Sequence, residues 1–351
     1  MLRRLLSVSV ALLLAACGSS PLDDQAATSN DDLAAATVFY RGRTVSIIVG
    51  SGAGGGFDTT ARLVARHIGR HIPGTPTVIV VNMPGGGGLV AANHLFNAAP
   101  RDGTVIGLFP EAQVMNQLTG SEAVQFDLLK FNWLGSSYND PNVCLVRADT
   151  AVTGFQSLIG RAEPIAIGGT GPGADSHDAP RVLAKATGAH LRTVAGYSTT
   201  NEVRLGIERG EVHGMCLGWE SVRATAGPWL EDKYARVLVQ NGTVRHRDLP
   251  DVPLAIEFAR DEESRALLRL FDAPSSISKP FALPPDVDER RVRVMRAALA
   301  ATYIDAAFLD EAAALRLDVQ PKTAPEIHQV LSEVLATPPG IAAKYREMIQ
   351  P

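Results

Sequence analysis

The chain has few cysteines, no long cationic run and little excess charge, and each of these absences excludes a class of protein. Three cysteines in 351 residues are too few for a scaffold built from disulfides. No run of five or six Lys or Arg occurs and the formal net charge is -4, so nothing indicates nucleic-acid binding. After the N-terminal leader, no apolar stretch approaches the roughly eighteen residues of a membrane-spanning helix.

The chain does have enough apolar surface for a core, together with many glycines. Hydrophobic residues make up 46% of it and charged residues 20%, which excludes wholesale disorder. The 32 Gly and 22 Pro fall in separate clusters without a G-X-Y period, which excludes a collagen-like chain. The length predicts about two domains.

The N-terminus is typical of a bacterial export signal. Arg3 and Arg4 precede an apolar run that covers about 18 Å as a helix, too short for a hydrocarbon core of about 30 Å. The run ends in LAAC at Cys17, which resembles the lipoprotein cleavage box; an ordinary secretory signal is the alternative. We expect a lipoprotein signal peptide over residues 1–16, lipidation at Cys17 and a flexible tether over 17–37. Either alternative exports the protein to the periplasm.

The other two cysteines, Cys144 and Cys216, lie in apolar runs typical of strands. In an exported chain they pair if those strands are neighbours, and otherwise remain two separately buried thiols. The sequence leaves both alternatives open.

Strand and helix patterns alternate along the chain. Strands are predicted at 44–49, 77–81, 104–109, 142–146, 165–167, 193–194, 212–217 and 235–240. Helices are predicted at 58–72, 89–98, 154–161, 176–187 and 200–209, and over most of the chain after residue 257. Strands joined by helices indicate an α/β fold with mainly parallel sheets flanked by helices. The order predicts two lobes, with 38–140 plus 245–351 forming lobe 1 and 141–244 inserted as lobe 2.

Three glycine-rich turns follow predicted strands, and we call them the first (50–56), second (84–88) and third (168–173) glycine turns. The first matches the dinucleotide pattern G-x-G-x-x-G, but Asn82 stands where a ribose-binding acid belongs. It is not a phosphate-binding Walker loop either, because Phe57 and Asp58 follow it instead of Lys and Ser/Thr. We therefore expect no cofactor.

The physical property that makes both motifs bind phosphate is still present in this sequence. Glycines allow main-chain N–H groups to approach a ligand, and the helix that follows adds the positive end of its dipole. Such a turn binds an anion without any Lys or Arg. Each turn alone is also explained as a tight strand-to-helix connection. Three of them, divided between two lobes, predict an anion site in the cleft at the carboxyl ends of the strands.

Four segments carry a family resemblance: VSIIVGSGAGGGFDTTARLVARHI, VIVVNMPGGGGLVAANHLFNAAPRDGTVIG, AIGGTGPGADSHDAPRVLAKATG and YSTTNEVRLGIERGEVHGMC. In this order they resemble the Bug-type extracytoplasmic solute receptors of tripartite tricarboxylate transporters. The resemblance implies a two-lobed Venus-flytrap periplasmic binding protein, similar to type II, that holds a small carboxylate and serves membrane permease subunits. Carried over by position, the ligand-binding residues are Ser51, Gly52, Ala53, Gly54, Gly55, Asp58, Gly85, Gly86, Thr170, Gly171, Ser176, His177, Tyr197 and Asn201.

Catalysis has little support in the sequence. Asp175, Ser176 and His177 are adjacent, and adjacent residues cannot form a nucleophile–base–orienter line. No G-x-S-x-G elbow occurs. We expect Ser176 to cap the helix that follows, with its hydroxyl available to a ligand.

Other side chains allow two interpretations each. Asp58 either caps its helix or holds the first glycine turn in shape, and Tyr197 is either a core residue or a wall of the cleft. His67 and His71 have the i, i+4 spacing of metal ligands but fit a solvated helix face better, so we expect no metal. Trp219 and Glu220 are cleft candidates by position alone.

The sequence therefore predicts an exported receptor, not an enzyme, for a small organic anion. Closure of the lobes on the ligand would be read by a transporter or by a sensor. An exported hydrolase that uses the same amides as an oxyanion site is the alternative from another class.

Overall fold

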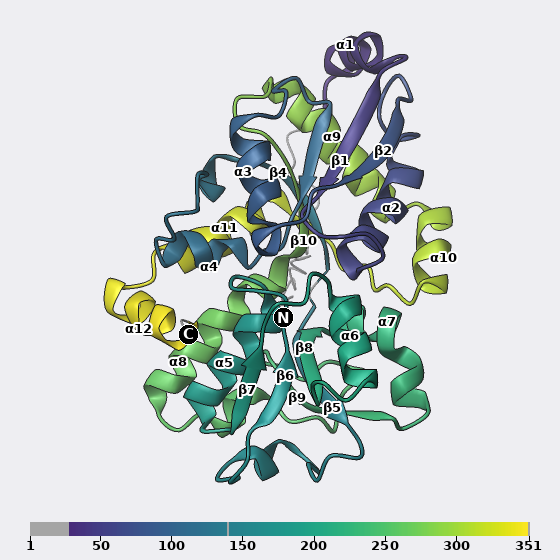
Figure 1. Cartoon of the computed structure of the whole chain (residues 1–351). Helices are drawn as coiled ribbons and strands as arrows, with labels where there is room; N and C mark the ends of the chain where they lie inside the picture. The colour runs from purple at the N-terminus through teal and green to yellow at the C-terminus, as the bar shows by residue number, and fades with distance from the viewer. Residues whose placement is uncertain (1–27, 139, 350–351) are drawn as a thin grey trace, which may run out of the picture.

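The computed structural model describes residues 28–138 and 140–349. The predicted signal peptide (1–16), Cys17 and the beginning of the predicted tether lie outside the described residues. The described chain forms two lobes stacked one above the other, each with a central sheet (Figure 1).

The first sheet has six strands and is covered by helices on both faces. Its order is β11 (Lys322–Thr323), β4 (Asn132–Tyr138), β10 (Ser278–Leu283), β3 (Val105–Leu108), β1 (Thr44–Val49) and β2 (Thr77–Asn82). Neighbouring residues of β1 belong to different clusters, because Ile47 packs toward α2 (Gly56–Ile68) and α9 (Glu289–Tyr303) and Ile48 packs toward the opposite face. Burial on both faces explains why the strand ends in three consecutive apolar residues, Ile47, Ile48 and Val49.

The second sheet has five strands, in the order β7 (Leu191–Val194), β6 (Ile165–Gly168), β8 (Gly214–Gly218), β5 (Asn142–Arg147) and β9 (Ala235–Gln240). Helix α5 (Asp175–Thr187) packs on one face, and α6 (Thr200–Glu208) and α7 (Trp219–Glu231) pack on the opposite face. Both α5 and α6 follow the parallel strands β6 and β7, as βαβ units require.

The α/β fold class is confirmed, but the sheets are mixed rather than mainly parallel. In the first sheet β1 is parallel to β2 and β3, whereas β10 is antiparallel to β3 and β4. In the second, β5 is antiparallel to β8 and β9. The reason is connectivity: β5 and β10 enter their sheets from the opposite lobe, so they run against the local βα units.

The remaining helices are α1 (Asn30–Tyr40), α3 (Leu89–Asn97), α4 (Gln113–Leu118), α8 (Glu262–Asp272), α10 (Ala306–Ala314), α11 (Ala324–Leu335) and α12 (Pro339–Ile349). The connections between elements contain five short 3-10 turns: η1 (Gly86–Gly88), η2 (Leu128–Lys130), η3 (Phe155–Leu158), η4 (Ala255–Phe258) and η5 (Ala273–Ile277). Helices α8 and α12 pack against α5 of the second lobe. The partition of the chain into 38–140 plus 245–351 and 141–244 therefore stays a prediction, with α8 and α12 lying against lobe 2.

The predicted tether is wrong over residues 30–37, which belong to helix α1. Ser29 and Asp32 form a reciprocal capping box at its start, a local signal for a helix. Tyr40 is fully buried and donates its hydroxyl to the carbonyl of Gly103, while Asp32 forms an ion pair with Arg293. These contacts hold α1 against the first lobe.

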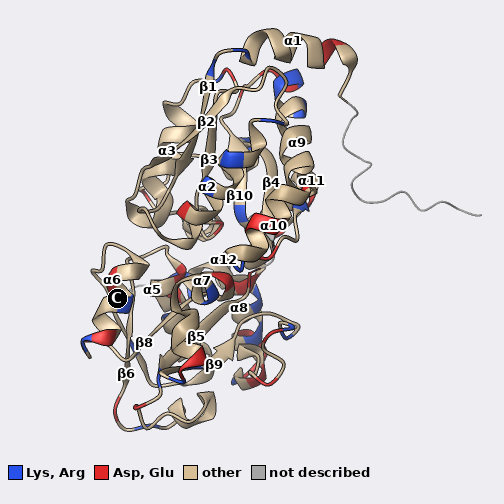
Figure 2. Cartoon of the chain, turned by 90° about the vertical axis from the view of Figure 1, so that its right-hand side faces the viewer, with Lys and Arg blue, Asp and Glu red and all other residues tan. Residues whose placement is uncertain are grey.

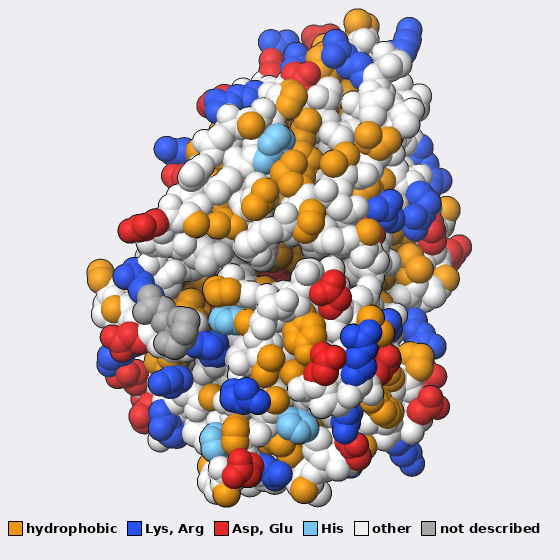
Figure 3. Space-filling view, in the orientation of Figure 1, with side chains coloured by type: hydrophobic (Ala, Val, Ile, Leu, Met, Phe, Trp, Pro, Cys, Tyr) orange, Lys and Arg blue, Asp and Glu red, His pale blue; other side chains and the backbone are white. Residues whose placement is uncertain are grey.

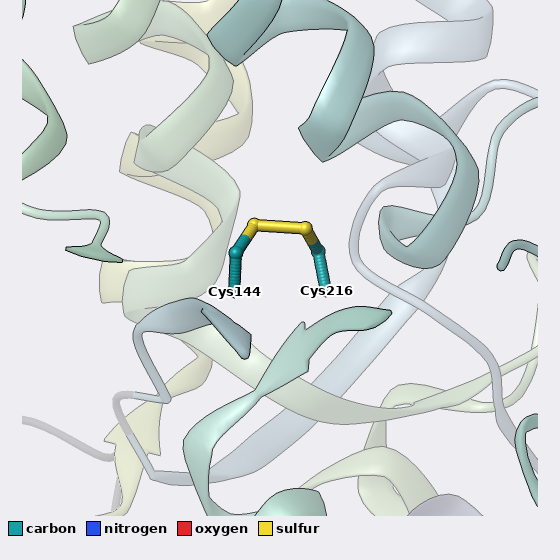
Figure 4. Close-up of a disulfide and its surroundings, with 2 residues drawn as sticks. All are labelled: Cys144 and Cys216. Atoms are coloured by element: carbon teal, nitrogen blue, oxygen red, sulfur yellow. A yellow bond between two sulfur atoms is a disulfide. The ribbon is translucent and has the colours of Figure 1, made fainter. Parts of the chain in front are cut away.

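A disulfide joins Cys144 of β5 to Cys216 of β8 (Figure 4). The two residues are direct cross-strand partners in the antiparallel ladder, so the strands are neighbours and the pairing alternative holds. The bond lies two residue pairs away from Asn142 and Gly218, which end these strands at the cleft described below.

Within 28–138 and 140–349, the helices are all too short or too polar to cross a bilayer.

Candidate functional site

A cavity of about 500 Å³ lies between the two lobes and is lined from both. Figure 3 shows the hollow at the junction of the upper and lower lobes. All three glycine turns reach it, from β1, β2 and β6. Its position at the carboxyl ends of these parallel strands is the place where open α/β sheets bind ligands.

The first glycine turn leads into α2, whose N-cap Gly55 makes no side-chain capping bond. Asp58, a buried residue of α2, holds the turn: its Oδ2 accepts a hydrogen bond from the Gly54 N–H at 2.8 Å. Asn82 donates to Asp58 Oδ1 at 2.8 Å and to the Ser51 carbonyl at 3.0 Å. Asp58 therefore holds the turn in shape, the second of the two interpretations that the sequence allowed.

The second glycine turn requires glycine for its backbone. Gly85, Gly86, Gly87 and Gly88 all have positive φ, between 56° and 136°, a region that side chains disfavour. Gln113 donates to the Gly87 carbonyl at 2.7 Å and fixes the turn from α4. The turn therefore presents bare backbone to the cleft.

The third glycine turn leads into α5, whose N-cap is Ala174 and makes no side-chain capping bond. Ser176 is not the N-cap, contrary to the prediction. Its Oγ lies 3.2 Å from the Thr170 N–H and 3.1 Å from the Thr170 hydroxyl, because the turn folds back over the first helical turn. Asp178 accepts the Gly173 N–H at 3.1 Å and also contacts His177 Nδ1 at 2.7 Å.

Helix N-termini from both lobes meet at this cavity. Gly55 of α2, Ala174 of α5 and Thr199, the N-cap of α6, all line it. The first two helices start without a side-chain cap, so their first N–H groups remain available as donors. The dipoles add positive potential where these helices begin.

The glycine turns also let the two lobes approach each other. A Cβ on Gly52 would lie 3.1 Å from Thr199 Cγ2, and one on Gly56 would clash with the Ser221 hydroxyl. A Cβ on Gly87 would lie 3.2 Å from the backbone of Gly173, in the third turn. The lack of side chains thus has a second physical consequence, close packing across the cleft.

The structure brings most of the sequence-predicted residues to the cavity. Those that line it are Ser51, Gly52, Gly55, Gly85, Gly86, Thr170, Gly171, Ser176, Tyr197 and Asn201. Those that do not are Ala53, Gly54, Asp58 and His177; Ala53 and Gly54 are exposed, and Asp58 and His177 are buried beneath the turns. The role of all fourteen in binding stays a prediction.

Tyr197 is half-buried: it forms a wall of the cavity and also packs against the core of the second lobe. Its hydroxyl donates to Glu211 at 3.1 Å, which leaves the ring as the surface offered to a ligand. Trp219 and Glu220, which the sequence offered as cleft residues by position alone, do not line the cavity. Both are buried, and Trp219 donates a hydrogen bond to Asp248.

Sequence reasoning missed a group of ionisable residues in the cavity wall. Glu111, Asp140 and Asp175, which we call the acidic cluster, line it together with Lys279. Burial raises the pKa of Glu111 to about 8, that of Asp140 to about 7 and that of Asp175 to about 6. Asp175 is noticeable in the sequence only as the neighbour of Ser176 and His177. No motif links it to Glu111 and Asp140, because the three residues come from separate segments.

Lys279 is a buried lysine on β10, with 1% of its side chain exposed. Its ammonium pairs with Glu220 of α7, which is 3% exposed and comes from the other lobe. Burial lowers the pKa of Lys279 to about 7 and raises that of Glu220 well above its ordinary value. Lys279 also has a positive φ of 54°, a costly backbone conformation for a lysine.

In the described part of the chain, one cluster consists of residue types that can bind a metal ion. It contains His246, Asp248 and Asp318, whose donor atoms lie within 4.8 Å of one another. Arg223 lies 3.5 Å from Asp318 and also pairs with Asp248, and Arg247 pairs with Asp318 at 2.6 Å. Two guanidinium groups thus already neutralise these carboxylates. In Figure 2 the ribbon near α7 contains both Lys or Arg and Asp or Glu segments.

His67 and His71 contact carboxylates of α10 and its N-cap, not solvent alone. His67 Nε2 lies 2.6 Å from Glu311 Oε2, and His71 Nε2 lies 2.8 Å from Asp305 Oδ2. The expected solvated face is therefore a helix–helix contact, and each histidine has its own carboxylate partner.

Two lobes, two mixed sheets and a cleft between them define the two-lobed fold of periplasmic solute-binding proteins. Neither a protein-family model nor a curated protein matches the sequence. Solved structures with this fold do match. MatC from Rhodopseudomonas palustris with bound malate is 18% identical over 88% of this chain and 99% of that chain, with a TM-score of 0.67.

Two further solved structures show the same architecture. The periplasmic binding protein BugD is 19% identical over 88% of this chain and 98% of its own, with a TM-score of 0.67. Rpa4515 of R. palustris with adipate is 18% identical over 88% and 97%, with a TM-score of 0.68. At these identities the likeness establishes the fold.

Proposed function

We propose that this chain is an extracytoplasmic solute-binding receptor that captures a small organic carboxylate between its lobes for a tripartite-type membrane transporter. The observation that carries the proposal is the convergence of three glycine turns and two uncapped helix N-termini on one interlobe cavity. Of the solved structures that share the fold, one holds malate and another is described with adipate.

The geometry suits a carboxylate held by main-chain donors. Gly85, Gly86 and Gly171 place backbone without side chains at the cavity wall. Ser51 lines the same wall, and its hydroxyl, buried in this structure, has no hydrogen-bond partner among the described residues. Charge on the ligand is then offset by N–H groups and helix dipoles rather than by a guanidinium.

Closure of the lobes supplies the signal. A ligand that contacts both lobes binds the closed state more tightly and shifts the population toward it. Permease subunits would recognise that state; a sensor protein that reads the same state is the alternative partner. Export through the N-terminal signal, with a lipid anchor on Cys17, belongs to the same proposal, and the Cys144–Cys216 disulfide suits an oxidising compartment.

The test is a thermal-unfolding screen against mono-, di- and tricarboxylates. One of them should stabilise the protein by about 2.7 kcal/mol at a hundredfold excess over its Kd, and should be recovered chemically unchanged. Turnover of the compound in the same incubation would favour an exported hydrolase instead.

A matched pair of variants locates the site. A Cβ on Gly171 or on Gly154 meets nothing within 4 Å, and neither glycine has a positive φ, so valine is tolerated at both. Gly171 lines the cavity and Gly154 does not. Gly171→Val should abolish the ligand-induced stabilisation, whereas Gly154→Val should keep it. An equal response of both variants would contradict the location.

A further inference from the structure

One end of the cavity is acidic, which is unexpected for a receptor of simple anions. Glu111 follows β3, Asp140 precedes β5 and Asp175 begins α5, so the acidic cluster is assembled from both lobes. The ammonium that lines the same wall, Lys279, is paired with a fourth carboxyl group, that of Glu220. Carboxyl groups therefore outnumber ammonium groups at this end.

The carboxyl groups are only partly engaged by the protein. Glu111 Oε2 accepts the Lys279 N–H at 3.3 Å, and Asp140 Oδ1 accepts the Glu220 N–H at 2.9 Å. Glu111 is also hydrogen-bonded by the Ser278 side chain. A carboxylate has about four acceptor sites, so acceptor capacity remains in the wall.

A second observation at the same place points to a ligand. Asn142 is 4% exposed and lines the cavity, and its Oδ1 has no hydrogen-bond partner among the described residues. Its amide nitrogen lies 3.5 Å from Ser275 Oγ, and a hydrogen bond links the side chain to Asp175. A buried carbonyl oxygen without a donor costs about 1–3 kcal/mol, so a donor is the missing element here.

We infer that the ligand is zwitterionic, with its carboxylate at the glycine turns and a protonated amine against Glu111, Asp175 and Asn142. This inference rests on the proposed function, because it assigns the opposite end of the same ligand. An ammonium group offers three donors and a positive charge, which match two carboxyl groups and an amide oxygen. A second carboxylate placed there would meet carboxyl oxygens and the unpartnered Asn142 oxygen, and repulsion from the ionised members of the cluster would oppose it.

The ionisation of the cluster gives the inference a pH signature. Lys279 and Glu220 face it from β10 and α7, Asp178 lies in α5, Asp272 in α8 and Arg223 in α7. An ammonium lowers the pKa of the carboxyl groups that it contacts, so its binding releases protons and tightens as the pH rises from 6 to 8. Binding of a dicarboxylate would take up protons and weaken over the same range.

The experiment is titration calorimetry of the full mature protein with matched series of three to six carbons. Each series contains the dicarboxylate, the amino acid with one carboxylate replaced by an amine, the 2-amino dicarboxylate and the diamine. At pH 7.5 an amino acid or amino dicarboxylate should bind at least tenfold more tightly than the corresponding dicarboxylate.

Variants assign the preference to the cluster. Asp175→Asn and Glu111→Gln should each reduce the preference for the amine at least fivefold while dicarboxylate binding holds or improves. Asp248→Asn, outside the cavity, should leave the preference unchanged, and a circular dichroism spectrum checks that each variant is folded. An unchanged preference in both cluster variants would overturn the assignment.

The remaining outcomes are distinguishable. A dicarboxylate that binds as tightly as its amino counterpart overturns the zwitterion and leaves the proposed function intact. Binding of the diamine alone, or of no compound with a carboxylate, overturns the proposed function and the zwitterion together.

Discussion

Lys279 and Glu220 form a buried ion pair that joins the two lobes beneath the cavity. Lys279 lies on β10 of the first sheet, and Glu220 lies in the first turn of α7, which follows β8 of the second sheet. Burial opposes the charge on each, so their mutual contact and the neighbouring hydrogen bonds must offset two desolvation costs.

Breaking this pair should destabilise the protein strongly. Glu220→Met or Lys279→Met each leaves one buried charge without its partner, and we expect a loss of about 3–5 kcal/mol in the free energy of unfolding. The double variant should recover most of that loss, since no charge remains to be buried. Urea unfolding measures all three. Single-variant losses below about 1 kcal/mol would mean that the pair is not formed in solution.

Adding a side chain at Gly56 should hinder closure of the lobes. Its Cβ would clash with the Ser221 hydroxyl across the cleft, while the backbone at Gly56 accepts any residue. Gly56→Val should therefore weaken ligand binding at least tenfold with little change in unfolding. Ser221→Gly in the same chain should restore most of the affinity. If calorimetry finds no rescue, the clash across the cleft is not the cause.

The acidic cluster should make the unliganded protein less stable as the pH rises. A carboxyl group with a raised pKa in the folded state contributes stability that is complete below its unfolded pKa and is lost as the pH rises through its folded pKa. For Glu111 the folded pKa is about 8 against 4.5, so its contribution declines between pH 5 and 7. Burying the charged Lys279 ammonium costs stability. This cost is almost fully present from pH 5 to pH 7, since it is relieved only as the pH rises above about 7.

Glu111→Gln isolates this effect. The free energy of unfolding of the unchanged protein, minus that of the variant, should fall steadily from pH 5 to pH 7 in denaturant titrations. Titrating groups common to both proteins, such as His246, cancel in this difference. A difference that is constant with pH, or one that rises, would contradict the raised pKa.

The disulfide should contribute to stability without being needed for binding. Cys144 and Cys216 are 72 residues apart in sequence, and removing a cross-link over a loop of that size costs about 2–5 kcal/mol. The double Ser variant should unfold at lower urea concentration and still bind ligand, because neither sulfur lines the cavity. Loss of binding in a folded double variant would show that the bond also shapes the ends of β5 and β8.

The parts of the fold that sequence predicted have local signals. The β-branched run at 44–49 forms β1 at the predicted bounds, and the glycine turns follow their strands as expected. The second glycine turn was predictable because its positive φ angles are a local demand that glycine meets.

The parts that sequence missed depend on partners far along the chain. Strand β10 begins with Ser278, Lys279 and Pro280, which are poor signals for a buried strand, yet every residue in it is buried. Lys279 is tolerated there because Glu220 lies opposite, a pairing that spacing does not reveal. The acidic cluster was missed for the same reason, since Glu111, Asp140 and Asp175 meet only in the folded protein.

The most direct test of the central claim is a crystal structure with the carboxylate that stabilises the protein most. In that structure the ligand carboxylate should lie between the lobes, within hydrogen-bond distance of main-chain N–H groups of the glycine turns. A carboxylate bound by arginine or lysine side chains, or outside the interlobe cavity, would contradict it.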